Sequence, residues 1–328
     1  MKNLSARATG TTVRRRVAYL MFIIATVIWG FAFVAQQAAT LIPPFSVGAI
    51  RSLLATVFLF GLIPLMDRLT KNGRGIAAGR GLLDFKRKEL VAGLVLGIII
   101  TVATTFQQHG LGSGTDTGKA AFITALYVVF VPIMSTIFGK KPHLTSIISI
   151  PIAIVGFYFL CIKQSSALEL SDALVLACAI IFAIHIISVD RLSEGCDGVR
   201  ISLIQFAIAF VLNGILALIF EGGVAMSDVI AVMPSLLFLG ICSSGIAYTL
   251  QILGQQEIDP TVSSMILSLE SVFGVIGGAL FFGERMSGRE YLGCGIVFCA
   301  VILAQLDPAW VKKLLTKKTN TNGKNESK

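Results

Sequence analysis

The sequence has few charged residues. Only 14% of its 328 residues are Asp, Glu, Lys or Arg, whereas 55% are hydrophobic. A soluble globular domain carries about 25% charged residues. The apolar excess is greater than a core of this size needs, and a lipid bilayer is the solvent that accounts for it. The composition therefore predicts an integral membrane protein.

Residues typical of catalytic and metal sites are also scarce. The three histidines are scattered at positions 109, 143 and 185, and none of the six cysteines has CxxC spacing. The glycines between Gly112 and Lys119 lack Walker spacing, and Ala120 stands where a Ser or Thr is required. We therefore expect no enzyme activity, no cofactor, no metal and no nucleotide hydrolysis, so that a gradient would drive any transport.

The net charge of +9 reflects membrane topology rather than nucleic-acid binding. The basic residues lie at the two chain ends and in short loops, with no basic stripe interleaved with aromatic residues. If the N-terminus is cytoplasmic, 22 Lys and Arg residues fall on the cytoplasmic side and 4 on the outer side. Cytoplasmic loops carry the excess of basic residues in membrane proteins. The sequence thus predicts a multi-pass protein of the plasma membrane with both termini in the cytoplasm.

The hydrophobic runs predict ten membrane helices. A helix that crosses a bilayer needs about 20 mostly apolar residues. Segments of this kind lie at 17–37, 43–66, 90–108, 118–138, 144–162, 172–189, 200–220, 233–253, 261–282 and 289–306. The expected fold class is therefore all-α integral membrane.

An internal repeat divides these helices into two halves. When the chain is shifted by 144 positions, Gln107 falls on Gln251, and Phe138-Gly139 falls on Phe282-Gly283. The halves, 17–162 and 172–306, hold five predicted helices each, and an odd number of spans inverts the second half relative to the first. Inverted repeats commonly build alternating-access transporters with the substrate site between the halves. We expect the first four helices of each half to line that site.

Three segments resemble signatures of the EamA family, in the drug/metabolite transporter superfamily. Residues 27–34 read Val-Ile-Trp-Gly-Phe-Ala-Phe-Val, like the first helix of the family. Residues 127–132, followed by Gly-Lys-Lys-Pro at 139–142, resemble its fourth helix and exit. Residues 268–273, followed by Phe-Gly-Glu-Arg-Met-Ser at 282–287, resemble its ninth helix and exit. The similarity extends over roughly 17–306, with one departure: many members have proline where this chain has Ser271, so no proline kink is expected there.

The resemblance implies a ten-helix fold of two inverted five-helix repeats around a central cavity, with the fifth and tenth helices at the periphery. Members of the family export amino acids and other metabolites, or import compounds such as vitamins. The family resemblance alone does not select a substrate.

Three ionisable residues lie within predicted membrane helices, where polar groups are costly and usually face a cavity or a neighbour. Glu270, near the middle of its helix, either binds a substrate amine or a proton, or fixes helix packing. Arg51 either holds a carboxylate or pairs with an acid. His185 either titrates near neutral pH or is a hydrogen-bonded core residue.

Six further residues are candidates for the cavity because they offer hydrogen bonds or a flat wall. Gln107 and Gln251 are repeat mates, which favours symmetric placement near the central axis. The tryptophan either lines the cavity or only packs between helices. The remaining candidates offer amide or hydroxyl groups; the six residues are Trp29, Gln107, Tyr127, Gln205, Tyr248 and Gln251.

The sequence is best explained by a secondary transporter that exports small metabolites, amino-acid-like or otherwise polar or amphipathic. The alternatives are a channel or scaffold that does not concentrate its solute, and a membrane-embedded enzyme, which would need a cluster of catalytic residues. The expected partners are a small-molecule substrate and the lipid bilayer, without nucleic acid, and homodimer formation is left open.

Overall fold

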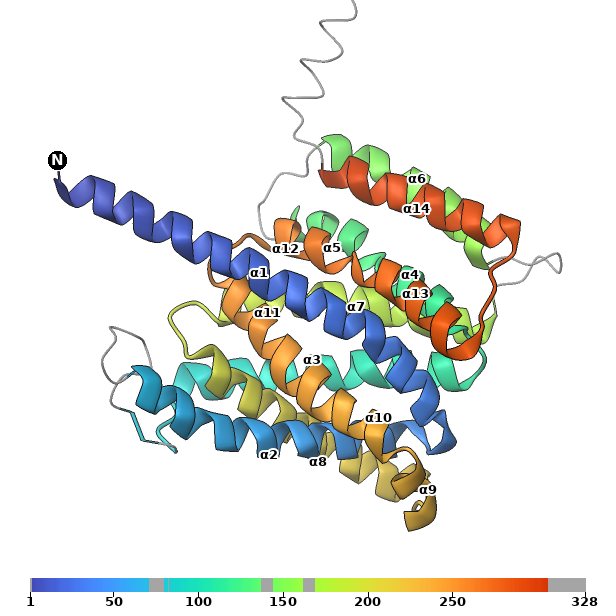
Figure 1. The fold of residues 1–328 in the computed structure, drawn as a ribbon, viewed down its shortest axis with the longest axis horizontal. Coiled ribbons are helices and arrows are strands. Elements are labelled where there is room, and N and C mark those ends of the chain that lie inside the picture. The colour runs from blue at the N-terminus through green and yellow to red at the C-terminus, as the bar shows by residue number, and fades with distance from the viewer. Residues whose placement is uncertain (1, 71–79, 82, 137–143, 162–168, 306–328) are drawn as a thin grey trace, which may run out of the picture.

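The computed structural model describes residues 2–70, 80–81, 83–136, 144–161 and 169–305, and it contains helices but no strand within these ranges. The helices lie side by side as a bundle (Figure 1). In chain order they are α1 (Lys2–Ala38), η1 (Ala39–Leu41), α2 (Pro44–Thr70), α3 (Arg87–Gly112), α4 (Thr117–Thr124), α5 (Tyr127–Ser135), α6 (Leu144–Cys161), α7 (Leu170–Leu192), α8 (Gly198–Phe220), α9 (Met226–Ala231), α10 (Met233–Leu237), the π-helix η3 (Phe238–Ala247), α11 (Tyr248–Gln255), α12 (Pro260–Leu267), α13 (Glu270–Phe282) and α14 (Gly288–Gln305).

Eight segments of the described chain are long and apolar enough to cross a membrane. They are 13–41, 44–65, 87–112, 117–135, 170–192, 198–220, 233–255 and 260–282. The two other predicted spans, 144–162 and 289–306, coincide with α6 and α14, which pack against each other along one edge of the bundle (Figure 1).

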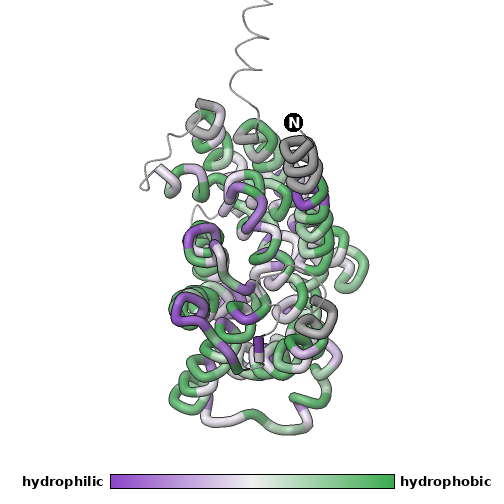
Figure 2. The backbone as a smooth tube through the Cα atoms, turned by 90° about the vertical axis from the view of Figure 1, so that its left-hand side faces the viewer, coloured by the Kyte–Doolittle hydropathy of each residue, from purple (hydrophilic) through white to green (hydrophobic). Residues whose placement is uncertain are grey.

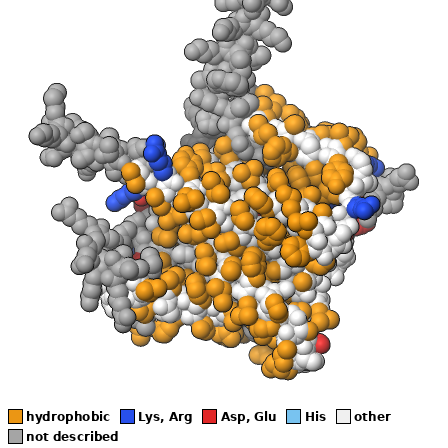
Figure 3. All heavy atoms as spheres, in the orientation of Figure 1, with side chains coloured by type: hydrophobic (Ala, Val, Ile, Leu, Met, Phe, Trp, Pro, Cys, Tyr) orange, Lys and Arg blue, Asp and Glu red, His pale blue; other side chains and the backbone are white. Residues whose placement is uncertain are grey.

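The surface between the two ends of the bundle is hydrophobic. Large side chains such as Val57, Leu218 and Leu280 are more than half exposed. On the face shown in Figure 3, apolar atoms cover the middle, and the coloured Lys, Arg, Asp and Glu side chains lie at its margins. Exposed apolar area of this extent is what a lipid-facing surface requires.

The bundle has two distinct ends. We call the end where α3, α8 and α12 begin the Glu89 end, and the opposite end, where α2 and α4 begin and α13 ends, the Glu284 end. The helix α1 enters and α14 finishes at the Glu89 end (Figure 1). Figure 2, viewed from that end, shows several hydrophilic stretches gathered there. Which side of a membrane this end faces stays a prediction.

Close helix contacts depend on small residues. A methyl group on Gly93 or Gly97 of α3 would overlap Ile204 or Ile208 of α8. A methyl group on Gly274 of α13 would likewise overlap Ala121 of α4. Small residues let backbones approach in a membrane, where packing rather than the hydrophobic effect holds helices together.

Two membrane-spanning segments are interrupted in the same way. A tight turn separates α4 from α5, where the Leu126 amide donates to the Ile123 carbonyl at 3.1 Å. A similar turn separates α12 from α13, where the Leu269 amide donates to the Ile266 carbonyl at 3.2 Å. The second interruption occurs without a proline, since position 271 is a serine. The hydroxyl group of Ser271 instead donates to the Ser268 carbonyl at 2.8 Å, a back-bond that bends helices.

Candidate functional site

A cavity of about 440 Å³ lies in the middle of the bundle, next to both interrupted helices. Its lining comes from α1, α2, α3, α4, α5, α7, η3, α11, α12 and α13. These elements include three of the four helices expected from the second half; α8 contributes no lining residue. The residues immediately before and after the two tight turns face the cavity: Thr124, Tyr127, Leu267 and Glu270.

Arg51 is the cation of this cavity. It lies seven residues after the start of α2, about 10 Å along the helix axis from the Glu284 end. The side chain is buried, and its Nε and Nη2 atoms donate to the hydroxyl groups of Ser244 and Ser243 at 3.1 and 3.2 Å. Among the described residues, no carboxylate forms an ion pair with Arg51. Its guanidinium therefore has donors left for another acceptor.

The two serines reach Arg51 because they belong to the π-helix η3. The wider turn of a π-helix is rare and is often found at functional sites. The Ser243 carbonyl also accepts a hydrogen bond from Trp29 Nε1 at 3.3 Å. The Trp29 ring packs against that of Tyr248, with 4.6 Å between the centroids and 57° between the planes. The π-helix thus joins the cationic group to an aromatic wall.

Glu270 is the anion of the cavity. It is the first residue of α13 and is only 4% exposed. No described Lys or Arg lies within ion-pair distance of its carboxylate, and Arg51 on the same cavity does not contact it. The cavity therefore holds a basic and an acidic side chain that do not pair with each other, an arrangement that is costly at lipid depth unless a ligand or water completes it.

Two amide oxygens of the lining also lack partners within the described chain. The amide oxygens of Gln36 and Gln251 are buried without a hydrogen bond. Gln107 is satisfied, since its Nε2 atom donates to the Thr124 hydroxyl at 3.1 Å. Buried polar groups are normally paired, so the two free oxygens need water or a bound molecule as a donor.

Seven of the nine residues singled out from the sequence line this cavity. They are Trp29, Arg51, Gln107, Tyr127, Tyr248, Gln251 and Glu270. The other two, His185 and Gln205, are fully buried and pair with each other, with 3.0 Å between His185 Nε2 and Gln205 Oε1. The His185 ring meets the Tyr248 ring edge-on at 5.8 Å. These two residues therefore lie behind the wall of the cavity rather than on its surface.

The sequence reasoning missed some of the lining. Gln36 follows Trp29 by seven residues, and that spacing places both on one face of a helix. Ser243 escaped notice because a serine in an apolar run is unremarkable unless the π-helix turns it towards Arg51. Thr124 is recognisable as the hydrogen-bond partner of Gln107 only once the positions of the helices in space are known.

Comparisons with known proteins agree with the shape of the molecule. The model of the EamA-like transporter family matches the chain twice, at residues 16–162 and 170–306. An uncharacterized transporter of Archaeoglobus fulgidus is 27% identical over 300 residues, which cover 90% of this chain and 87% of that protein. One of Methanothermobacter thermautotrophicus is 24% identical over 85% of this chain and 83% of its own length.

A crystal structure shares the fold. It superposes with a TM-score of 0.59 over 88% of this chain and 96% of its own, at 17% sequence identity. At this identity the similarity concerns the fold alone.

Proposed function

The chain belongs to the EamA-like transporter family, and we propose that it is a secondary transporter of small zwitterions, amino-acid-like compounds among them, across the plasma membrane. The observation that carries the substrate class is the pair of uncompensated charges in one cavity. Arg51 is suited to a carboxylate, which accepts hydrogen bonds from guanidinium and hydroxyl groups. Glu270 is suited to an ammonium group.

The rest of the lining supports the same class of substrate. Trp29, Phe33, Phe182 and Tyr248 provide an aromatic surface for an apolar side chain. The printed names of the relatives also point towards transport rather than catalysis.

The transport mechanism we propose is alternating access between two inverted halves of five helices each. The two matches of the family model and the similar interruptions of α4–α5 and α12–α13 support this division. In such transporters the substrate binds near the midplane, beside discontinuous helices. On this model α6 and α14 complete the ten spans, both termini are cytoplasmic, and the Glu284 end faces outwards.

Export driven by an ion gradient is the most economical coupling for this chain, since the sequence has no nucleotide-binding motif. Glu270 is then also the group that would exchange a proton against the substrate. A channel would share the cavity but would not concentrate its solute.

The proposal can be tested with purified protein in liposomes. The assay is uptake of a labelled amino acid, with unlabelled competitors that lack one charge: its methyl ester and its N-acetyl derivative. We expect both derivatives to compete at least tenfold more weakly than the parent zwitterion, because each leaves one buried charge without its partner. Equal competition by all three would contradict the zwitterion assignment. Concentrative uptake that an uncoupler abolishes separates a transporter from a channel.

A further inference from the structure

The helix α4 carries part of the cavity wall and is tied to the second half of the chain at its first turn. Glu284, just beyond α13, accepts hydrogen bonds from the backbone amides of Thr117 and Gly118, at 2.9 Å to Oε1 and 3.0 Å to Oε2. Amides at a helix start have no partner within the helix, and the helix dipole favours a negative charge there. A carboxylate of one half thus caps a helix of the other.

A second carboxylate holds the same turn from another side. Asp172, in the first turn of α7, accepts from Lys119 Nζ at 2.5 Å and from the Thr115 hydroxyl at 3.1 Å. Both Lys119 and Asp172 are almost fully buried. The beginning of α4 is therefore bonded to α7 as well as to the end of α13.

The end of α13 is shaped to deliver the Glu284 carboxylate. Gly283 has a φ of +64°, a left-handed conformation that ends the helix and turns the chain back. Gly278 leaves room for the returning side chain, since a methyl group at 278 would overlap the Glu284 carboxylate. Neither glycine lines the cavity, so their role is to let the Glu284 carboxylate reach the start of α4.

At the other end of the bundle the corresponding helix, α12, is capped from within its own half, because the Asp259 side chain accepts from the Thr261 amide at 2.9 Å. One carboxylate that joins the two halves there is Glu89, which accepts from the Asp197 amide at the start of α8 at 3.1 Å. The contact of Glu284 with α4 therefore belongs to the Glu284 end alone.

We infer that Glu284 and Asp172 form a lock that keeps the cavity closed at the Glu284 end. This inference rests on the proposed transport function. Opening the Glu284 end requires the start of α4 to separate from α13 and α7, and both carboxylates oppose that movement. Loss of the Glu284 carboxylate should therefore shift the protein towards the state open at the Glu284 end.

The test measures access to the cavity from each side of a membrane. All six cysteines are replaced, and Thr124→Cys introduces one thiol into the lining. A membrane-impermeant maleimide is applied to right-side-out and inside-out vesicles. The lock is removed in two ways: Glu284→Ala deletes the carboxylate, and Gly278→Ala displaces it without changing the charge. Glu290→Ala is the matched control, because this partly exposed acid caps its own helix, accepting from the Ser287 amide at 2.7 Å.

We expect both lock variants to raise the labelling rate from the outer side about tenfold, the population shift for losing hydrogen bonds to a charged group. Glu290→Ala should leave the rate unchanged. Unchanged outer labelling in folded Glu284→Ala and Gly278→Ala, with the thiol still labelled from the inner side and protected by substrate, overturns the lock and leaves the transport proposal standing. A thiol inert from both sides in every variant overturns both.

Discussion

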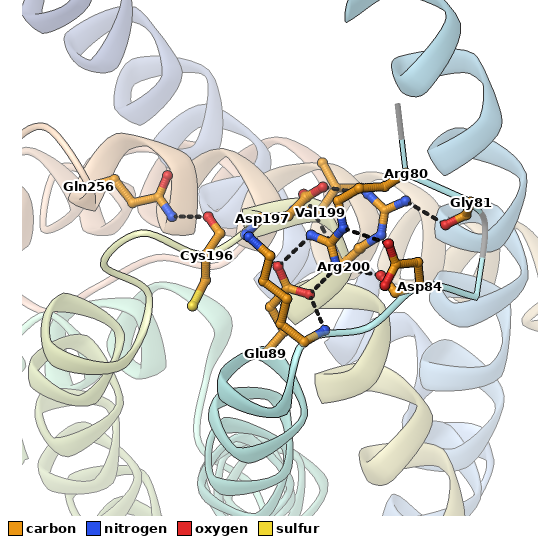
Figure 4. Close-up of polar contacts among 10 residues, drawn as sticks. Arg80, Gly81, Asp84, Glu89, Cys196, Asp197, Val199, Arg200 and Gln256 are labelled. Carbon is orange, nitrogen blue, oxygen red and sulfur yellow. Dashed lines mark hydrogen bonds and ion pairs between the residues drawn. The ribbon is translucent and has the colours of Figure 1, made fainter. Parts of the chain in front are cut away.

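The charged side chains of the cavity and those of the Glu89 end are both buried, but only the latter are paired. At the Glu89 end, Glu89 accepts hydrogen bonds from Arg80 at 2.7 Å on each oxygen and from the Asp197 amide at 3.1 Å (Figure 4). Arg200 donates to Asp197 at 2.6 Å and to the Gly81 carbonyl at 2.9 Å. In the cavity, by contrast, Arg51 contacts only two serines and Glu270 has no cationic partner.

The difference distinguishes charged residues that are paired within the fold from charged residues that are available to bind another molecule. A buried ion is tolerated when its partners replace the water it has lost. The hydrogen bonds that Arg80 donates to Glu89 raise the pKa of Arg80, so this arginine stays charged and Glu89 holds it near the start of α8. Within the described chain Arg51 and Glu270 lack such partners, and the proposed zwitterion would supply them.

The largest effect on stability is expected at the Glu89 end. The substitution Glu89→Ala leaves Arg80 and the Asp197 amide without their acceptor, and breaking a buried ion pair costs about 3–5 kcal/mol. Thermal unfolding in detergent should therefore occur at a clearly lower temperature. Asp84→Ala is the control: its side chain is 60% exposed and lies 3.5 Å from Arg80, and exposed pairs contribute at most about 1 kcal/mol. Equal losses in the two variants would argue against the special role of the buried pair.

The next effect concerns binding rather than stability. The substitution Arg51→Gln removes the cation but keeps a donor for Ser243 and Ser244. We expect the affinity for a zwitterion to fall roughly 10- to 100-fold, as for a lost hydrogen bond to a charged group, while the unfolding temperature changes little. Substrate-dependent thermal stabilisation measures both quantities in one assay.

The control for this prediction is Arg289→Gln. Arg289 lies in α14 and stacks over Tyr158 of α6, with 5.3 Å from Cζ to the ring centroid, away from the cavity. Its replacement should leave the affinity unchanged. If Arg51→Gln binds the zwitterion as the parent protein does, the cavity cation does not recognise the substrate.

The sequence predicted the spans well because lipid imposes a simple rule on length and hydropathy. Each of the ten expected ranges contains at least one helix in the described chain, and eight segments meet the criteria for a membrane span. Ionisable residues at lipid depth are so costly that Arg51 and Glu270 could be selected from the sequence alone, and both line the cavity.

The same reasoning could not separate His185 from the lining, because the costs of burial are equal for a residue on the cavity and one behind it. The sequence reasoning also could not predict where the helices are interrupted. No proline marks the turn at Ser268 and Leu269, and the π-helix at 238–247 has no sequence signature that we recognise. Both depend on how hydroxyl groups and neighbouring helices satisfy the backbone.

A smaller effect on binding is expected for Glu270. The substitution Glu270→Gln removes the charge and keeps the shape and hydrogen-bonding capacity. The folded yield should be retained, while the affinity for the zwitterion falls about tenfold and the N-acetyl derivative loses its disadvantage. The side chain in Glu270→Leu cannot form hydrogen bonds. This variant should lose the same affinity as Glu270→Gln and should also lower the folded yield. Transport by Glu270→Gln at the parental rate, with unchanged pH dependence, would make Glu270 a packing residue.

The smallest effect is expected for His185 and Gln205, which border the cavity without facing it. Their hydrogen bond satisfies only half of each side chain, since His185 Nδ1 and Gln205 Nε2 have no partner in the described chain. Replacing both partners by apolar groups of similar shape can be nearly neutral, whereas replacing one leaves the other unsatisfied. We therefore expect His185→Phe alone to lower the free energy of unfolding by about 1 kcal/mol, and the double variant His185→Phe with Gln205→Leu to recover most of that loss.

In both variants a phenylalanine ring can still support Tyr248 from behind, so the affinity for substrate should change by less than about threefold. Unfolding temperature and substrate affinity, measured for the two single variants and the double variant, complete the cycle. A loss of affinity as large as that of Arg51→Gln would place His185 among the binding residues. It would also show that the pairing of a buried polar group does not by itself distinguish the walls of this cavity from its supports.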